Sequence, residues 1–309
     1  MLPQHLIILS PVGEAIATTI QQALPELIIQ QGGPEPQAPY ALITFTPGPE
    51  LADYPNASWI HIAGSGANSV LDRLEEFDLP TPPLITRTVG RMGSQIGEYV
   101  LSYILADSQK HAVRRGLQQA RHWDVQQGSA TLIAGQKALI LGTGAIGSGV
   151  AKALRAMGMI PIGVSRSGAP RDPFETIYAW DALDDLSGID VCIGALPLTL
   201  QTDGLINATL LERLDQALFI NVGRGATAHI PDVLKGLEAG HLRHAVLDVV
   251  PREPLPPDSP LWDVPDLAIT PHVSGITIPE DTSDAFIAAY RALEAGQAPA
   301  LIVDPTAGY

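Results

Sequence analysis

The sequence is poor in cysteine, in positive charge and in long apolar runs. Its one cysteine, Cys192, cannot form an internal disulfide, which fits the reducing cytoplasm. Its 18 lysines and arginines are outnumbered by 33 aspartates and glutamates, so a net charge of −15 repels nucleic acids and anionic membranes. No apolar run approaches the roughly 20 residues that span a bilayer. The sequence therefore predicts a cytoplasmic protein whose partner is a small molecule, and screening over roughly 8 Å still allows that molecule to be an anion.

Repeats and low-complexity tracts are also lacking, whereas short apolar strand patterns alternate with helical patterns along most of the 309 residues. This alternation predicts a doubly wound α/β fold, with helices on both faces of parallel sheets. A chain of this length can form two such domains. Residues 94–119, with apolar side chains at helical spacing, predict one long amphipathic helix, and residues 279–294 predict a last helix.

A glycine-rich turn follows the strand pattern that begins at residue 137 and precedes a helical pattern. The series is Gly142-x-Gly144-x-x-Gly147, and its strand–turn–helix context is typical of dinucleotide-binding proteins. The first glycine permits the tight turn, the second lets the backbone approach a pyrophosphate, and the third lets helix and strand pack closely. The N–H groups of the first helical turn, which includes Ala145 and Ile146, would bind the phosphates. The alternative is a tight turn without a ligand.

The end of the next strand carries Ser165, Arg166 and Ser167, where many dinucleotide sites have an acidic residue. A carboxylate there would bind the ribose hydroxyls and repel a 2′-phosphate. Hydroxyls and a guanidinium favour the phosphate oxygens instead. The segment therefore predicts that NADP(H) is preferred and NAD(H) is possible, with Arg171 as a second candidate cation. If Arg166 points to solvent, either cofactor would bind.

Three further segments complete a pattern that resembles a known family. They are INVGRGA with Arg224, LDVVPREPLP with Asp248 and Glu253, and SPLWDVPDLAITPHVSG with His272. With the glycine turn, their order and spacing resemble the D-isomer-specific 2-hydroxyacid dehydrogenases. The segments VSRS, ALPLT and SPLW resemble the glyoxylate/hydroxypyruvate reductase branch of that family.

The resemblance implies two Rossmann-like domains. Residues 1–93 and 276–309 would form a flavodoxin-like substrate domain, and residues 94–275 a dinucleotide-binding Rossmann domain. The active site would lie between them. A homodimer would form through the helix and arm of residues 94–130, with Trp123 near the neighbouring subunit's substrate site.

The resemblance also implies a catalytic set of Arg224, Glu253 and His272. His272 follows an apolar strand into a Val-Ser-Gly loop, where α/β sheets present ligands, and it would donate a proton near neutral pH. Glu253 would pair with His272, and Arg224 would bind the substrate carboxylate. Taken singly, these residues could equally be a surface ion pair, a core histidine and a capping arginine.

Further site residues come from the same resemblance. Asp248 is expected at the nicotinamide carboxamide, and the backbone of Gly64, Ser65 and Gly66 at the substrate carboxylate, unless these glycines only form a turn. Other cofactor contacts are expected from Leu196, Pro197, Val222, Gly223, Ser274 and Gly275. No metal is expected, because His241 and His244 have no third ligand nearby in the sequence. Cys192, in an apolar strand, is expected to be an unreactive core residue.

The implied activity is the NADPH-dependent reduction of a small 2-keto acid, such as glyoxylate or hydroxypyruvate, to the D-2-hydroxy acid. Two alternatives stay open: a cofactor-sensing binding protein on the same scaffold, and a dehydrogenase of another small anion, such as phosphite or formate. The complete Arg–Glu–His set argues against the first. Glu253 argues against formate, because formate enzymes of this family usually replace the glutamate.

Overall fold

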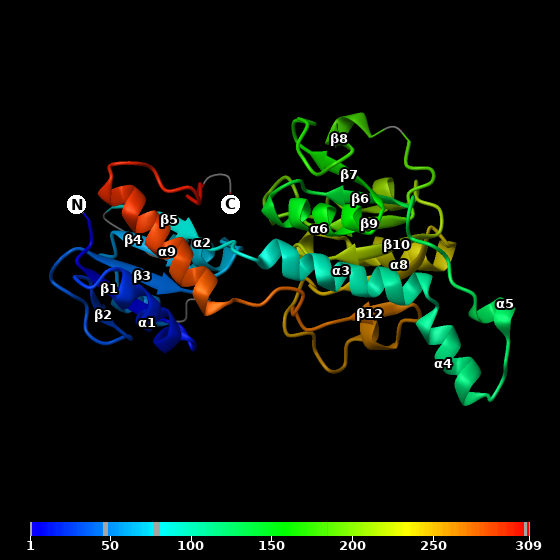
Figure 1. The fold of residues 1–309 in the computed structure, drawn as a ribbon, viewed down its shortest axis with the longest axis horizontal. Helices are drawn as coiled ribbons and strands as arrows, with labels where there is room; N and C mark the ends of the chain where they lie inside the picture. Colours follow the sequence, from blue (N-terminus) through cyan, green and yellow to red (C-terminus); the bar gives the residue numbers. More distant parts are fainter. Residues whose placement is uncertain (1, 46–48, 77–80, 184, 306–307, 309) are drawn as a thin grey trace. The chain divides into compact units, whose positions relative to one another are not determined.

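The chain divides into two compact units, each built on its own parallel sheet (Figure 1). The computed structural model describes residues 2–45, 49–76, 81–183, 185–305 and 308. One unit comprises Met1–Met92 and Thr277–Tyr309, and the other Gly93–Ile276. The predicted fold class, α/β with doubly wound parallel sheets, is confirmed. The breaks fall within one residue of the expected boundaries, and the division of roles into substrate and cofactor domains stays a prediction.

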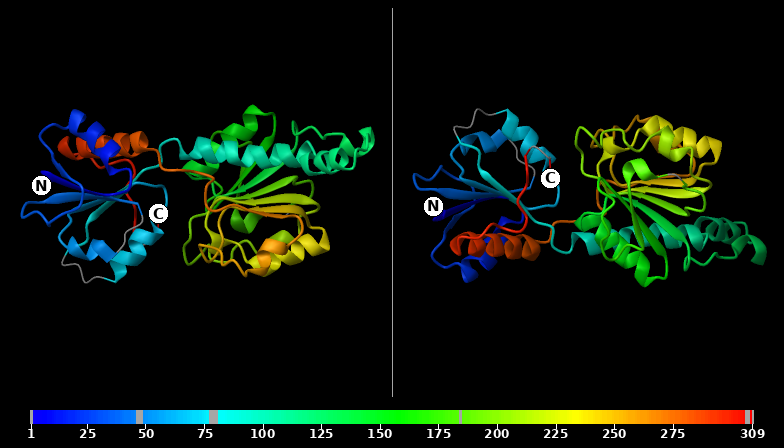
Figure 2. Two further views of the ribbon diagram at one scale, coloured as in Figure 1. Left: turned by 90° about the horizontal axis from the view of Figure 1, so that it is seen from below. Right: turned by 90° about the horizontal axis from the view of Figure 1, so that it is seen from above.

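The first unit has the strand order β2-β1-β3-β4-β5, the flavodoxin-like order. Ile16 and Ile20 of α1 and Phe286 of α9 pack on one face of the sheet, and Val70 of α2 packs on the other (Figure 2). The last helix runs from Pro279 to Glu294, as predicted. The elements are β1 (His5–Leu9), α1 (Gly13–Ala23), β2 (Ile28–Gln30), β3 (Tyr40–Thr44), η1 (Pro49–Asp53), β4 (Trp59–Ile62), α2 (Asn68–Glu75), β5 (Leu84–Arg87) and α9 (Pro279–Glu294).

The second unit has the strand order β12-β11-β10-β9-β6-β7-β8, with α3 and α6 on one face and α8 on the other (Figure 2). The chain order reverses between β6 and β9, and ligands of open α/β sheets bind at such a switch point. Its strands are β6 (Lys137–Leu141), β7 (Ile160–Ser165), β8 (Thr176–Ala179), β9 (Val191–Gly194), β10 (Ala217–Asn221), β11 (Leu242–Leu247) and β12 (Leu267–Ile269). Its helices are α3 (Met92–Ser108), α4 (His111–Gln119), α5 (Val125–Gly128), α6 (Ala145–Ala156), η2 (Trp180–Ala182), α7 (Ala208–Leu211), η3 (Gly225–Thr227), α8 (Ile230–Ala239) and η4 (Pro260–Asp263). Among the described residues, none of the helices is long and apolar enough to cross a membrane.

The expectation of one long helix over residues 94–119 is wrong. Helix α3 ends at Ser108, Lys110 adopts a left-handed conformation with φ 53°, and α4 starts at His111. The carbonyl of Ser108 accepts the N–H of Thr131 at 2.9 Å, where the chain returns from the arm. Apolar periodicity alone does not reveal this break, because tertiary contacts hold the end of α3.

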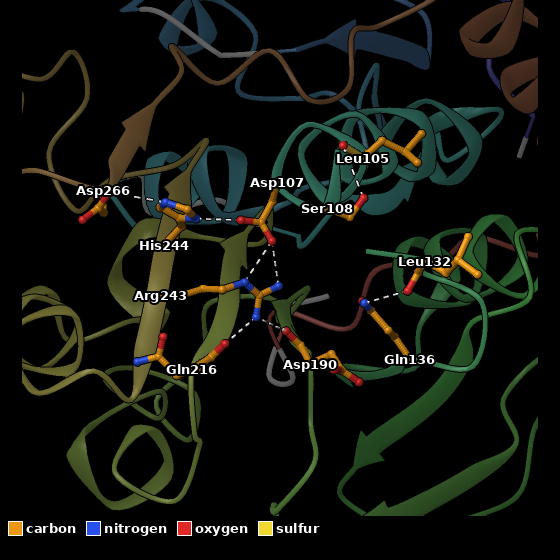
Figure 3. Close-up of polar contacts among 10 residues, drawn as sticks. All are labelled: Leu105, Asp107, Ser108, Leu132, Gln136, Asp190, Gln216, Arg243, His244 and Asp266. Carbon is orange, nitrogen blue, oxygen red and sulfur yellow. Dashed lines mark hydrogen bonds and ion pairs between the residues drawn. The ribbon is translucent and has the colours of Figure 1, made fainter. Parts of the chain in front are cut away.

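An ion cluster at the end of α3 supplies those contacts (Figure 3). Asp107 Oδ2 accepts from Arg243 Nε and Nη2 at 2.9 and 2.7 Å, and Asp107 Oδ1 lies 2.7 Å from His244 Nδ1. His244 Nε2 lies 3.3 Å from Asp266 Oδ1, and Arg243 also donates to the carbonyl of Asp190 at 3.0 Å. The cluster therefore ties the end of α3 to the start of β11 and to the segments that enter β9 and β12.

Within this cluster, His244 binds its proton more tightly than it does in the unfolded chain. The hydrogen bond to Asp107 raises the pKa of His244 above its usual 6.5, although burial opposes this rise. Burial alone would raise the pKa of Asp107, but hydrogen bonds from His244 and Arg243 outweigh it and leave this pKa lowered. The His244 contribution to stability is therefore complete below about pH 6.5 and is lost as the pH rises through the raised pKa.

His244→Gln should lower the thermal unfolding midpoint most below pH 6.5, and the gap to the unmodified protein should narrow by pH 8.5. Glutamine can still donate to Asp107 but cannot carry the charge. His241→Gln is the matched control, because His241 Nδ1 contacts only the Leu214 carbonyl at 3.1 Å among the hydrogen bonds of the described residues. Unfolding curves at several pH values measure both variants, and a gap that is independent of pH would contradict the linkage.

Candidate active site

The predicted site residues of the second unit lie at or after the carboxyl ends of six neighbouring strands, β12, β11, β10, β9, β6 and β7. The glycine turn follows β6, and the segment with Leu196 and Pro197 follows β9. In the register of the last three strands, Asn221 pairs with Leu247 and Leu247 with Ile269, so β10, β11 and β12 end at the same level. The structure thus brings these residues to one edge of one sheet. The positions that follow β10, β11 and β12 are Val222, Gly223, Arg224, Asp248, Glu253, His272, Ser274 and Gly275.

The glycine turn after β6 has the shape of a phosphate cradle. Gly142 has φ 104°, and a Cβ there would lie 2.6 Å from the carbonyl oxygen of Ala195, so only glycine fits. A Cβ on Gly147 would overlap the carbonyl oxygen of Gly142, whereas a Cβ on Gly144 would meet no atom of the described residues within 4 Å. Gly144 is the N-cap of α6 and has no side chain to cap the first N–H groups of that helix, which include those of Ala145 and Ile146. These residues fit a dinucleotide pyrophosphate.

The loop after β7 can recognise a further phosphate. Ser165 Oγ accepts the N–H of Gly168 at 3.0 Å, and Ser167 Oγ accepts the N–H of Ala169 at 3.3 Å. Each hydroxyl is therefore oriented by the backbone and can donate its own proton to an anion. Arg166 is exposed beside them.

Arg171 is brought to the same place. Its Nη1 donates to the carbonyl of Thr143 at 2.8 Å, in the middle of the glycine turn. The sequence analysis gives Arg171 only as a second candidate cation. No local pattern shows that the loop after β7 folds back to the glycine turn.

His272 and Glu253 form the expected pair. His272 Nδ1 lies 2.7 Å from Glu253 Oε2, and Glu253 Oε1 accepts the N–H of Val250 at 3.1 Å. Because the carboxylate accepts, Nδ1 carries the proton and Nε2 is left for another partner. The two side chains are 48% and 37% exposed, so the pair is accessible from solvent. His272 has φ 56°, a left-handed conformation that is uncommon for any residue with a side chain.

Asp248 has a role that the sequence does not reveal. It is 1% exposed, and its carboxylate accepts the N–H groups of Val273 and Ser274, both at 2.9 Å. Its carbonyl also accepts the N–H of His272 at 2.9 Å. Asp248 therefore holds the loop that carries His272, and its contact with a nicotinamide carboxamide stays a prediction. The sequence signal for this role is an aspartate directly after an apolar strand. The register places the end of that strand, β11, beside the end of β12, from which the His272 loop starts.

Arg224 lies on a loop whose backbone is held by hydrogen bonds from residues of the same loop. Its carbonyl accepts from Thr227 Oγ1 at 2.6 Å and from Asn221 Nδ2 at 3.3 Å, and its Nη1 donates to the carbonyl of Gly223 at 2.8 Å. A Cβ on the next residue, Gly225, would overlap the backbone of Val250. The loop of Arg224 therefore touches the segment that leads to Glu253.

The predicted substrate loop lies in the first unit, after β4. Arg87 Nη1 donates to the carbonyl of Ser65 at 2.9 Å. A Cβ on Gly64 would lie 2.5 Å from Cε2 of the half-exposed Phe45, so the ring packs on this glycine. The sequence analysis missed Arg87 and Phe45, although each stands at the carboxyl end of a strand beside β4. Binding of a substrate carboxylate by the backbone of Gly64, Ser65 and Gly66 stays a prediction.

Two further kinds of site were considered in the sequence, a reactive cysteine and a metal centre. Cys192 is fully buried in β9, and burial raises its pKa to about 12, as expected for an unreactive thiol. Within the described ranges, no group of three or more His, Cys, Asp or Glu side chains is arranged to hold a metal ion.

The chain is similar to known proteins of one family. The model of the "D-isomer specific 2-hydroxyacid dehydrogenase, NAD binding domain" matches residues 101–274. A glyoxylate/hydroxypyruvate reductase A from Serratia proteamaculans is 34% identical over 300 residues, which are 94% of this chain and 94% of that protein.

Two solved structures share the fold over nearly the whole chain. A D-isomer specific 2-hydroxyacid dehydrogenase family protein from Aeromonas salmonicida has a TM-score of 0.85 and 32% identity, and the match covers 98% of this chain and 99% of that one. An NADPH-dependent glyoxylate/hydroxypyruvate reductase from Sinorhizobium meliloti, in complex with NADP and sulfate, has a TM-score of 0.83 and 28% identity over 99% and 100% of the two chains. These matches confirm the resemblance noted in the sequence. The chain belongs to the D-isomer specific 2-hydroxyacid dehydrogenase family of NAD(P)-dependent enzymes and carries that family's NAD-binding domain.

Proposed function

We propose that this protein is a cytoplasmic enzyme that reduces a small 2-keto acid, such as glyoxylate or hydroxypyruvate, to the D-2-hydroxy acid with NADPH. The 2.7 Å contact between His272 and Glu253 carries this proposal, because it provides an oriented proton donor at the edge of the sheet that bears the glycine cradle. The named activity of the Serratia and Sinorhizobium relatives supports the same substrate class.

Each residue of the catalytic set has a distinct task. NADPH, when bound, supplies the hydride. The Arg224 guanidinium binds the substrate carboxylate and polarises the keto oxygen. Protonated His272 donates from Nε2 to the alkoxide as it forms, while Glu253 holds the ring through Nδ1 and stabilises the imidazolium. The N–H groups of residues 64–66 are further donors for the substrate carboxylate.

The preference for NADPH rests on the loop after β7. Oriented hydroxyls of Ser165 and Ser167, with the guanidinium groups of Arg166 and Arg171, suit a 2′-phosphate, and NADH binds there more weakly. The remaining cofactor contacts are assigned to Leu196, Pro197, Val222, Gly223, Asp248, Ser274 and Gly275.

Assays of several 2-keto acids with both cofactors test this assignment. The unmodified protein should favour NADPH over NADH by at least roughly tenfold in kcat/KM, and Arg166→Ala should remove most of that preference, because a charge-assisted hydrogen bond contributes about 1.5–3 kcal/mol. Arg155→Ala is the matched control, since Arg155 contacts Asp172 and the Pro173 carbonyl. Equal use of both cofactors would contradict the NADPH assignment, and NADPH binding without turnover of any acid would favour a cofactor-sensing protein.

The proton donor is tested by substitution of the pair. His272→Ala should lower kcat for reduction by about 10²–10⁴-fold, because the proton donor is lost. Glu253→Gln should also lower kcat, with little change in NADPH binding, because a neutral amide supports the proton-donating ring less well than a carboxylate does.

His229→Gln provides the control for these two variants. His229 Nδ1 lies 2.9 Å from Asp232 Oδ2, and neither residue belongs to the proposed dyad. Its kcat should match that of the unmodified protein. An unchanged kcat in Glu253→Gln would mean that the glutamate does not support proton transfer.

We also propose a homodimer that forms through α3 and the arm of residues 109–130. No residue of α4 or α5 is buried, and Trp123 between them is 92% exposed. Such apolar exposure marks a surface that a second copy covers, with Trp123 at that copy's substrate site.

Light scattering should give the mass of a dimer, and Trp123→Asp should shift the protein toward monomer, because burying an unpaired carboxylate in the interface is unfavourable. Met157→Asp, an equally drastic change at an exposed apolar residue outside the arm, should leave the dimer intact. A monomeric unmodified protein would end the dimer proposal.

A further inference from the structure

Helix α3 holds both ends of the loop that carries His272. The Tyr99 hydroxyl lies 2.6 Å from Thr270 Oγ1, at the start of this loop. One turn earlier on the same helix, the amide of Gln95 makes both possible hydrogen bonds with the backbone of Ile276, each at 3.1 Å. All five residues lie in the second unit.

The hydrogen bonds at the start of the loop have a defined direction. Asp248 Oδ1 can only accept, so the Thr270 hydroxyl donates to it at 2.6 Å. The Thr270 oxygen is then the acceptor for the Tyr99 O–H. Burial raises the pKa of Tyr99 and keeps that proton in place. The chain therefore runs from Tyr99 through Thr270 to the same carboxylate oxygen that holds the N–H of Val273.

The base of this chain is rigid because α3 packs closely on α6. A Cβ on Gly97 would lie 2.9 Å from the Cβ of Ala153, and a Cβ on Gly149 would overlap the backbone of Gly93. This contact leaves little room for α3 to shift along α6, the helix that begins at the glycine cradle. Tyr99 thus links the position of the cofactor helix to that of the catalytic loop.

The loop needs such support because its central residue is strained. His272 has φ 56°, and a left-handed non-glycine residue persists only where its surroundings over-determine it. Asp248 supplies two of the bonds that hold this conformation, and the Thr270 hydroxyl orients the oxygen that makes one of them.

We propose that Tyr99 and Thr270 are positioning residues for the reaction. Their hydroxyls orient the Asp248 carboxylate, which keeps the His272 ring in line with Glu253. The inference rests on the proposed function, because it assigns these residues to the same proton-donating pair.

Thr270→Val removes the hydroxyl and keeps the shape of the side chain. We expect kcat for keto-acid reduction to fall about tenfold, because a hydrogen bond to a charged group is lost, while KM for NADPH and for the acid changes less than about twofold. Thr270→Ser should restore kcat to within about twofold. Tyr99→Phe should lower kcat about threefold, since its bond is between neutral groups.

Tyr54→Phe is the matched control for Tyr99→Phe. The Tyr54 hydroxyl donates to the Gly33 carbonyl at 2.8 Å in the first unit, so its loss should leave kcat unchanged. An equal fall in kcat for Tyr54→Phe, or an unchanged kcat in Thr270→Val, would overturn the inference.

Proton NMR gives a readout that does not depend on turnover. The ring N–H between His272 and Glu253 should give a low-field signal, identified by its loss in His272→Ala. Thr270→Val should weaken this signal or shift it upfield, and Thr270→Ser should restore it. If the unmodified protein reduces no keto acid, the proposed function fails, and the signal alone decides the positioning role: an unaltered signal in Thr270→Val refutes it.

Discussion

The buried carboxylate of Asp248 is the contact on which the site depends. It accepts two backbone N–H groups and one hydroxyl, and so it fixes a loop whose central histidine is in a left-handed conformation. Without these bonds a strained backbone would relax to a commoner conformation. The 2.7 Å contact between His272 and Glu253 therefore depends on the Asp248 carboxylate, which follows the neighbouring strand β11.

Close backbone contacts extend this order along the sheet edge. The glycine turn touches Ala195, Gly223 touches Leu196, and Gly225 touches Val250, so the segments after β6, β9, β10 and β11 form a continuous row. A side chain at any of these glycines would separate two neighbouring loops. The row places the glycine turn and Arg224 along one edge of the sheet, which suits the proposed extended cofactor beside its substrate.

Helix α3 connects two different regions of the second unit. Near its start, Gln95 and Tyr99 hold the His272 loop, and at its end Asp107 binds Arg243 and His244. The first contacts are held by neutral groups, whereas the second includes a histidine, His244, whose pKa is raised by its hydrogen bond to Asp107. The same helix leads into the exposed arm, so its two ends join the proposed site and the proposed dimer contact.

Local sequence patterns determined the fold class, the last helix, the glycine turn and the members of the proposed dyad, because strand alternation, glycine spacing and family motifs act over short stretches. Tertiary structure alone decided the break at Lys110, the contact of Arg171 with Thr143, and the chain from Tyr99 to Asp248. Each of these depends on side chains far apart in the chain, such as Tyr99 and Thr270. Packing of α3 against the sheet brings Tyr99 and Thr270 within hydrogen-bonding distance. No periodicity in the sequence predicts this contact.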